Sequence, residues 1–199
     1  SSGLCVNKII CLTLNVRSIL TTAAVFFMFA SCLAQQYPFV HYTPKDGLIS
    51  SQVRKIYQDS KGRLYFSSVN GLSVYDGARF INYNSKNGLA IDIVNCIIEM
   101  GNDSVWVVTN SNKINCLVNG QVKTIALKDT SVPVINMLFK DDHGILYAAA
   151  DEGLFLFDKG RFVKLPFINQ KGHDINSFIS FINSFGDHLI VQRDNSTVL

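Results

Sequence analysis

Four histidines are the residues of this sequence best suited to metal binding or acid–base chemistry, namely His41, His143, His173 and His188. They are spread along the chain, and no two have the H-E-x-x-H spacing of a metal site; no C-x-x-C pair occurs either. His143 and His188 fall in expected hairpin turns, where a histidine exposed to solvent is the ordinary case. We therefore expect no metal ion and no cofactor.

Acidic residues form two adjacent pairs, Asp141-Asp142 and Asp151-Glu152. Glycoside hydrolysis requires two carboxyl groups that face one cleft about 5–10 Å apart, whereas both pairs fall in expected loops. The sequence also contains no G-x-S-x-G elbow, Walker loop or dinucleotide fingerprint. We therefore predict no catalytic residues and expect this chain to recognise a partner rather than to catalyse a reaction.

Cys96 and Cys116 are the two of the five cysteines that follow the N-terminal segment. We place them on the first and third strands of one four-stranded sheet, which lie about 9–10 Å apart at the usual strand spacing. A disulfide requires Cα atoms within about 7 Å of each other. The expected result is two buried, free thiols.

Tyrosines are the remaining candidates for ligand contact, because a sugar ring can stack on a flat side chain that also carries a polar hydroxyl. Tyr37, Tyr42 and Tyr83 are the candidates. Packed sheets also use many aromatic side chains in their cores. We expect most of these tyrosines to belong to the core, so the sequence names no ligand-binding residue.

The N-terminal segment has the pattern of an export signal. Lys8 and Arg17 precede an apolar run at 19–30, and small residues follow it. A basic region, a short apolar region and a small residue are typical of a secretory signal peptide, which we predict to be helical and cleaved after Ala34. A retained anchor, which needs about 20 apolar residues, and lipidation of Cys32 are the alternatives.

The composition excludes two classes of protein. Hydrophobic residues make up 48% of the chain and charged residues 17%, whereas a disordered segment has few apolar residues and much charge. The net charge is +3, or +1 without the two basic residues of the predicted signal. Because positive and negative residues alternate rather than forming a basic face, we expect no nucleic-acid partner.

A repeat organises the rest of the chain. The segments 53–83 and 135–165 align without a gap. A weaker copy begins midway between their starts, at Val94, and a fourth copy begins near Asp174. The identities between the two segments pair Asp59, Gly62, Leu64, Tyr65, Gly71, Leu72, Asp76, Arg79 and Phe80 with Asp141, Gly144, Leu146, Tyr147, Gly153, Leu154, Asp158, Arg161 and Phe162.

Each copy has the pattern of four short strands separated by turns. In the first copy we predict strands at 53–58, 64–68, 72–76 and 79–84. Gly62 and Gly144 are expected to supply a positive φ at hairpin tips. The structural repeat positions, which we interpret as turn residues, are Asp59, Gly62, Gly71, Asp76, Gly77, Asp141, Gly144, Gly153 and Asp158.

Four strands in a period of about 40 residues are typical of a propeller blade. We therefore predict an all-β fold, a β-propeller of four-stranded antiparallel blades, with about three and a half blades of an incomplete ring. A β-sandwich is the alternative, but it requires no such repeat. The predicted organisation is a signal peptide at 1–34 and a partial propeller at 35–199, with blades at 47–86, 88–127, 131–166 and 174–199.

The first copy resembles the two-component regulator propeller repeat, whose pattern is V-x-x-I-x-x-D-x-x-G-x-L-W-[IF]-G-T followed by G-L-x-x-[YF]-D-G. The matching runs are DGL, QVRKIYQDSKGRLYF and NGLSVYDG. The resemblance covers about residues 38–199 and is strongest in the first and third copies. Tyr65 and Tyr147 stand where the family has a tryptophan, which survives only as Trp106.

The resemblance implies the extracytoplasmic sensor region of a bacterial histidine kinase, often a hybrid two-component regulator. It implies an oligosaccharide or other small ligand, further blades, a transmembrane helix and a kinase later in the same protein, and a location on the periplasmic face of the inner membrane of a Gram-negative bacterium. Homodimer packing is a further implied contact. The alternatives are a stand-alone secreted or lipid-anchored binding propeller and, third, a propeller-fold glycan hydrolase or lyase.

Overall fold

The computed structural model describes residues 19–21, 39–101, 103–128, 133–166, 177–186, 188–193 and 196–198. The chain divides into two compact units, 1–41 and 42–199. Residues 19–21 are helical, and the rest of the predicted signal peptide at 1–34 lies outside the described residues. None of the described helices has the length and apolar character needed to cross a membrane.

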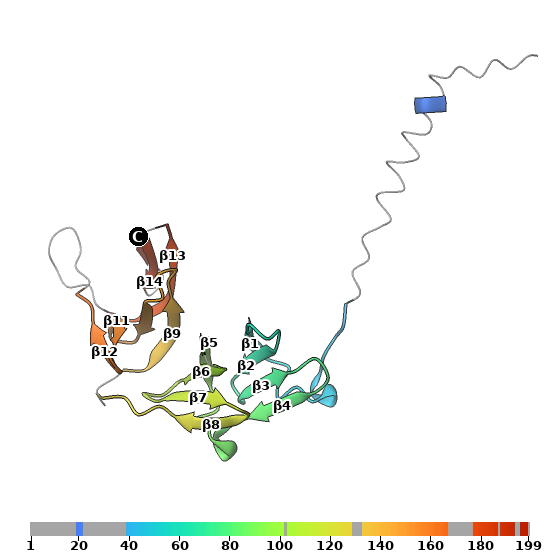
Figure 1. The fold of residues 1–199 in the computed structure, drawn as a ribbon, viewed down its shortest axis with the longest axis horizontal. Helices are drawn as coiled ribbons and strands as arrows, with labels where there is room; N and C mark the ends of the chain where they lie inside the picture. The colour runs from blue at the N-terminus through green and yellow to red at the C-terminus, as the bar shows by residue number, and fades with distance from the viewer. Residues whose placement is uncertain are drawn as a thin grey trace, which may run out of the picture. The chain divides into compact units, whose positions relative to one another are not determined.

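The described part of the second unit is built from antiparallel sheets whose strands follow chain order (Figure 1). Three sheets have four strands each and the last has three, which confirms the predicted all-β blades. Blade 1 contains β1 (Val53–Gln58), β2 (Leu64–Ser68), β3 (Leu72–Tyr75) and β4 (Phe80–Tyr83). Blade 2 contains β5 (Val94–Gly101), β6 (Ser104–Thr109), β7 (Ile114–Val118) and β8 (Gln121–Thr124). Blade 3 contains β9 (Ile135–Lys140), β10 (Leu146–Ala150), β11 (Gly153–Asp158) and β12 (Arg161–Lys164), and blade 4 contains β13 (Ile179–Phe185), β14 (His188–Arg193) and β15 (Ser196–Val198).

The strands of blade 1 agree with the predicted ranges except at the ends of the third and fourth strands. The fourth strand ends at Tyr83, one residue before its predicted end. At the turn between the two strands, the third strand ends one residue early and the fourth begins one residue late. The reason is Asp76, whose Oδ1 accepts hydrogen bonds from the backbone N–H groups of Ala78 and Arg79, both at 2.9 Å. Its side chain therefore fixes the turn one residue before the strand pattern ends.

A short 3₁₀ helix precedes each of the first two blades, η1 (Pro44–Asp46) before blade 1 and η2 (Ser85–Asn87) before blade 2. Thr43 and Asn84 cap them, each through a side-chain oxygen that accepts from the backbone N–H two residues later. The two caps occupy equivalent positions of the first and second copies, so the repeat includes the segment that leads into each of these blades.

Turn glycines hold conformations that other residues avoid. Gly62 and Gly144 both have φ +81° at the tips of the β1–β2 and β9–β10 hairpins, as expected from the repeat. Gly71 has φ +130°, and a Cβ atom there would lie 2.3 Å from the carbonyl oxygen of Tyr83. The β2–β3 turn therefore tolerates no side chain at this glycine.

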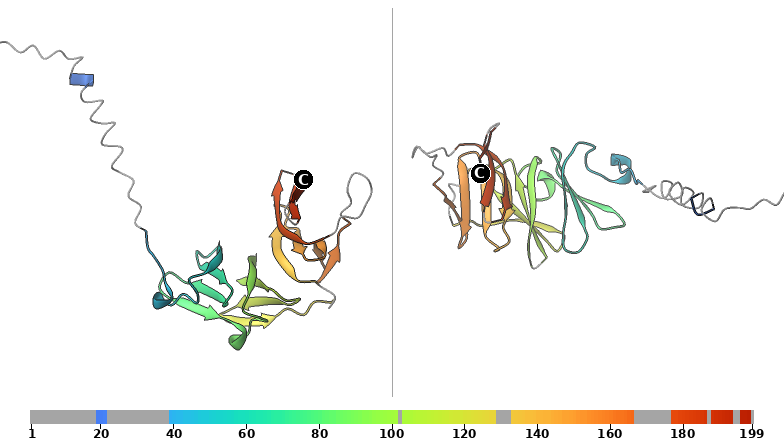
Figure 2. Two further views of the ribbon diagram at one scale, coloured as in Figure 1. Left: turned by 180° about the vertical axis from the view of Figure 1, so that it is seen from behind. Right: turned by 90° about the horizontal axis from the view of Figure 1, so that it is seen from above.

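Consecutive blades lie next to each other within residues 42–199 (Figure 2). Apolar residues of adjoining blades form three shared buried cores. Ile56 of β1 shows the consequence of lacking such a neighbour, because its side chain is 63% exposed. The corresponding residues Ile97 and Leu138, which each face an adjoining blade, are 7% and 2% exposed. In blade 4, Phe185 is 77% exposed. Each blade of this chain thus depends on its neighbour for a core.

Candidate functional site

We define a seam as the contact between the turn that joins the first two strands of one blade and the first strand of the next blade. The strand registers place four residues at the same position, directly before this turn. Gln58 pairs with Leu64, and Glu99 pairs with Val105. By the same register, Lys140 pairs with Leu146 and Ser184 with Leu189. Because the four blades share this register, the residues at the three seams can be compared position by position.

At the seam between blades 1 and 2, Asp59 organises the turn of blade 1. Its Oδ1 accepts from the backbone N–H groups of Lys61 at 3.0 Å and Arg63 at 2.9 Å. Its Oδ2 accepts from Arg63 Nε at 2.6 Å and from the Tyr65 hydroxyl at 3.0 Å. The residue is 5% exposed, and both carboxylate oxygens are therefore satisfied without water.

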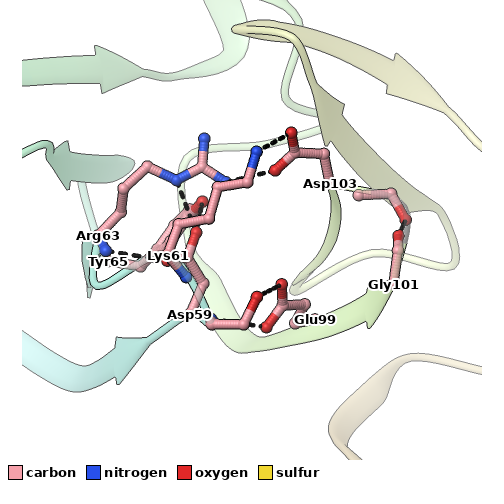
Figure 3. Close-up of polar contacts among 9 residues, drawn as sticks. Asp59, Lys61, Arg63, Tyr65, Glu99, Gly101 and Asp103 are labelled. Carbon is pink, nitrogen blue, oxygen red and sulfur yellow. Dashed lines mark hydrogen bonds and ion pairs between the residues drawn. The ribbon is translucent and has the colours of Figure 1, made fainter.

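Blade 2 completes this seam with two acidic residues (Figure 3). Glu99 accepts two hydrogen bonds from Ser60, 2.8 Å from the backbone nitrogen and 2.6 Å from the hydroxyl. Asp103 forms ion pairs with Lys61 and with Arg63, the latter at 3.4 Å. Side chains from both blades thus fill the seam and pair their charges.

The charges of this network shift the pKa values of its members. Burial alone would raise the pKa of Asp59, but hydrogen bonds from Arg63 and Tyr65 outweigh it and hold the pKa below the ordinary value. Burial, followed by the hydrogen bond to Asp59, raises the pKa of Tyr65 well above its ordinary value. Asp59 therefore stays ionised and Tyr65 stays a hydrogen-bond donor at neutral pH.

The seam between blades 2 and 3 is built from apolar side chains instead. Met100, which stands in the second copy where the first has Asp59, packs against the core shared by these blades. Trp106, which occupies the position of Tyr65, meets the ring of Phe157 edge-on with centroids 5.3 Å apart. Aromatic and apolar packing therefore replaces the buried carboxylate at this seam.

The seam between blades 3 and 4 contains a cavity of about 350 Å³. The turn of blade 3 is built like that of blade 1, because Asp141 Oδ1 accepts from the backbone N–H groups of His143 at 3.0 Å and Ile145 at 2.8 Å. The side chains that follow are different. The described residues that line the cavity are Asp141, Asp142, His143, Ile145, Tyr147, Ser184, Gly186, His188 and Leu189.

Three differences between the copies explain why this seam is open. His143 stands where blade 1 has Lys61, Ile145 where it has Arg63, and Ser184 where blade 2 has Glu99. Each replaces a long charged side chain by a shorter or uncharged one. Among the described residues, the side chains of Asp142, His143, Ser184 and His188 make no hydrogen bond or ion pair with one another or with other groups.

One wall of the cavity belongs to the packed core. Tyr147 and Leu189 pack against the core between blades 3 and 4. Burial, and then the neighbouring carboxylate of Asp141, raises the pKa of Tyr147, so its hydroxyl remains protonated at neutral pH. The cavity thus combines a fixed apolar wall with imidazole, hydroxyl and carboxylate groups that are open to a ligand.

The structure brings together two histidines that the sequence analysis kept apart. His143 lies in the β9–β10 turn, as predicted, whereas His188 is the first residue of β14 and not a turn residue. Both are exposed, as expected, and both line the cavity. His41 is exposed in the unit 1–41, and His173 lies outside the described residues. The register would have placed His188 at the position of Arg63, but only blade packing sets it beside the preceding turn. No group of three described His, Cys, Asp or Glu residues could hold a metal ion.

The acidic pairs do not face one another. Asp141-Asp142 precedes β10 and Asp151-Glu152 follows it, so the pairs lie at opposite ends of one strand. Asp151 Oδ1 accepts a hydrogen bond from Asn136 Nδ2 at 2.9 Å. A turn role, as expected from the sequence, accounts for Asp141 and Asp151.

The two cysteines lie on β5 and β7, on either side of β6, as the strand prediction required. Both are free. Cys96 is buried, and its burial raises the pKa of the thiol. The expectation of burial is wrong for Cys116, which is only partly buried. Its cross-strand neighbours are Trp106 of β6, which is itself only partly buried, and Lys123 of β8, which is exposed. Cys116 therefore lies on the face that packs against blade 3, but toward the edge of the contact rather than in its centre.

Tyr83 belongs to the core between blades 1 and 2, as predicted, and its hydroxyl donates to the carbonyl oxygen of Gly120 at 3.2 Å. Tyr42 packs against the rings of Tyr75 and Phe80, with centroids 5.2 and 5.3 Å away. Tyr37 lies outside the described residues. The structure thus gives Tyr42 and Tyr83 packing partners within blades 1 and 2.

Comparison with known proteins agrees with the predicted repeat. Residues 47–70 match the model of the family described as "Two component regulator propeller". This segment contains the Asp59 turn. No curated protein matches the chain.

Solved structures share the fold at low sequence identity. The extracellular domain assigned to a one-component system of B. thetaiotaomicron has a TM-score of 0.62 and 20% identity over 79% of this chain and 22% of its own. An extracellular domain assigned to a hybrid two-component system of the same organism has a TM-score of 0.60 and 19% identity, with the same coverage. Virginiamycin B lyase from Staphylococcus aureus has a TM-score of 0.50 and 19% identity over 68% of this chain and 47% of its own. The chain therefore spans about a fifth of the two bacteroidal domains that it matches.

Proposed function

Because its first blade carries a two-component regulator propeller repeat, we propose that this chain is part of an exported sensor, the propeller input region of a two-component histidine kinase. The observation that carries the proposal is the coincidence of the family match at 47–70 with blade 1 of a repeated four-stranded architecture. The ligand is a glycan or another small extracellular compound, and the site communicates with the kinase through a change in the propeller.

The similar structures support an extracellular location, since both bacteroidal domains are extracellular parts of regulatory systems. Exposed apolar side chains at both outer blades, Ile56 and Phe185, support contact with further blades of the same protein. The predicted signal peptide supports export of the chain to the periplasmic side.

Catalysis is the competing function, since a lyase shares the fold. The carboxylates at the described seams argue for recognition. Asp59 is fully engaged within its turn, and Asp141 is held by two backbone N–H groups. Neither is arranged opposite a second free carboxylate as glycoside hydrolysis requires.

Two experiments test the proposal. Reading the gene beyond the codon for Leu199 should reveal further blades, a transmembrane helix and a kinase domain, and a stop codon directly after it would contradict a sensor kinase. The full-length protein, reconstituted in vesicles, should change its autophosphorylation when a panel of glycans is added on the propeller side. Turnover of those glycans without any change in phosphorylation would support the lyase or hydrolase alternative.

A further inference from the structure

We propose that the cavity between blades 3 and 4 is a ligand site for a small hydroxylated compound that is neutral or positively charged, such as an amino sugar. This inference names the site and the ligand class for the proposed sensor, and in that sense it rests on the proposed function. It is carried by the contrast between two seams that share one backbone design.

The seam between blades 3 and 4, the open seam, has room for a small ligand. At the seam between blades 1 and 2, the closed seam, Lys61 and Arg63 of blade 1 form ion pairs with Asp103 of blade 2, and Glu99 of blade 2 accepts hydrogen bonds from Ser60. At the open seam the equivalent positions leave about 350 Å³, at the lower end of the ~300–1,000 Å³ range of small-molecule sites. A compound of about one or two rings suits a site of this size.

The second step is the polarity of the lining. Asp142 offers a carboxylate acceptor, while Ser184 and the two imidazoles of His143 and His188 can each donate and accept. None of these side chains is used elsewhere among the described residues. Vicinal hydroxyl groups, which both donate and accept, would satisfy them. Tyr147 supplies a fixed apolar surface for the carbon face of a ring.

The third step is charge. With histidines counted as neutral, the described lining holds the carboxylates of Asp141 and Asp142 and no lysine or arginine. A carboxylated or sulfated ligand would be repelled, whereas an ammonium group would be attracted. At the closed seam, Lys61 and Arg63 compensate the negative charges of Asp59 and Asp103. At the open seam, a cationic ligand would supply the positive charge that the described lining lacks.

The fourth step is the consequence for the fold. Lining residues come from β9–β10 of blade 3 and β13–β14 of blade 4, so a bound ligand would bridge the two blades. A ligand that binds only the assembled seam stabilises that assembly. A bound ligand would thus connect blades 3 and 4, as the ion pairs connect blades 1 and 2.

The test uses the full-length protein and three probes that share one ring and differ in charge: glucosamine, glucose and glucuronate. Calorimetric titration should give saturable binding of glucosamine and of glucose, with glucosamine tighter, and no binding of glucuronate. His143→Ala and His188→Ala should each weaken glucosamine binding at least tenfold, and Ile145→Arg should abolish it. Lys61→Ala at the closed seam is the matched control and should leave binding unchanged.

Each outcome bears on one of the two proposals. Absence of binding by all three probes, tighter binding of glucuronate, or binding that survives Ile145→Arg when a crystal structure shows the guanidinium filling the cavity would overturn the cavity assignment. Thermal unfolding of every variant shows whether a loss of binding reflects a loss of folding. His143→Gln keeps a hydrogen-bond donor without the imidazole, so it should bind glucosamine more tightly than His143→Ala does. If the cavity binds glucosamine but autophosphorylation never responds to extracellular compounds, the sensor function fails while the site stands.

Discussion

The turns after β1 and after β9 have the same backbone hydrogen bonds but different contacts with the next blade. In blade 1 the N–H of Asp59 donates to the carbonyl oxygen of Arg63 at 3.1 Å, and in blade 3 the N–H of Asp141 donates to that of Ile145 at 3.0 Å. In both turns the glycine N–H donates to the carbonyl oxygen of the aspartate at 3.0 Å. Yet the first turn is locked to the next blade by ion pairs, and the other borders a cavity.

The comparison indicates that the repeat fixes the residues that form the turn, whereas the residues that contact the next blade differ between copies. The aspartate binds backbone N–H groups of its own turn, so its role is independent of the neighbouring blade. The residues two and four positions later lie at the next blade, and their identity decides whether the seam is filled. Five predictions test this separation of roles.

The largest effect is expected for Asp59→Asn compared with Asp141→Asn. Removing the charge of Asp59, whose side chain is buried while its partner Arg63 is partly exposed, should cost about 3 kcal/mol. The same change at Asp141, which has no arginine partner, should cost about 1 kcal/mol. Thermal unfolding and hydrogen exchange of the hairpin amides in the full-length protein measure both. Equal losses would mean that the two turns are not different in kind.

Acid pH sharpens the same comparison. The folded-state pKa of Asp59 is lowered, so the stability that it contributes is present above the unfolded-state pKa of about 3.9 and is lost as the pH falls through the lower folded value. The protection of the blade 1 hairpin amides should therefore decrease below about pH 4 in the wild type. In Asp59→Asn this part of the pH dependence should disappear.

The third prediction concerns the acceptor of the second blade. Glu99→Gln keeps the shape but removes the charge that receives two hydrogen bonds from Ser60, and should cost about 1 kcal/mol. Ser184→Ala, at the equivalent position of the open seam, should have no measurable effect on stability because the Ser184 hydroxyl has no hydrogen-bond partner among the described residues. Thermal unfolding of the two variants checks the contrast.

The fourth prediction introduces the arginine of the closed seam at the equivalent position of the open seam. Ile145→Arg places a guanidinium beside Asp141 and should fill the cavity, with a gain of at most about 1 kcal/mol in unfolding free energy. A crystal structure of the variant should show the introduced guanidinium on the Asp141 carboxylate. A guanidinium extended into solvent, with the cavity unchanged, would show that more than this residue keeps the seam open.

The smallest effect is expected for the exposed ion pair. Lys61 and Asp103 have side chains that are 55% and 34% exposed, so a double-mutant cycle should give a coupling of about 0.5 kcal/mol or less. That coupling should decrease further as salt is raised, because the pair is screened. A salt-independent coupling of several times this size would indicate that the seam is drier than its exposure implies.

Much of the fold could be predicted from the sequence because the interactions that form a blade are local. Strand positions in blade 1 follow from apolar runs and from turn residues such as Gly62, and the error at Asp76 was one residue at each side of a turn. The partial exposure of Cys116 could not be predicted in this way. It depends on how far the contact with blade 3 extends across the sheet, from Trp106 toward the exposed Lys123 of β8.

The candidate site escaped the sequence analysis for a related reason. His143 and His188 belong to different copies and have no spacing that marks a site. Their juxtaposition requires the turn of blade 3 to meet the first two strands of blade 4. Comparing the residues on either side of each turn glycine across the copies would have shown that the charged pair of blade 1 is missing from blade 3.

The amino-acid sequence by itself determined the repeat length, the four-strand pattern and the turns, since hairpin register is fixed by residues a few positions apart. Tertiary structure alone decided which side chains meet at a seam, because those contacts join residues about one repeat apart through the packing of whole blades. That packing closed one seam with opposite charges and the next with apolar and aromatic side chains. It left a cavity at the last seam, where the side chains of Asp142, His143, Ser184 and His188 have no hydrogen-bond partner among the described residues.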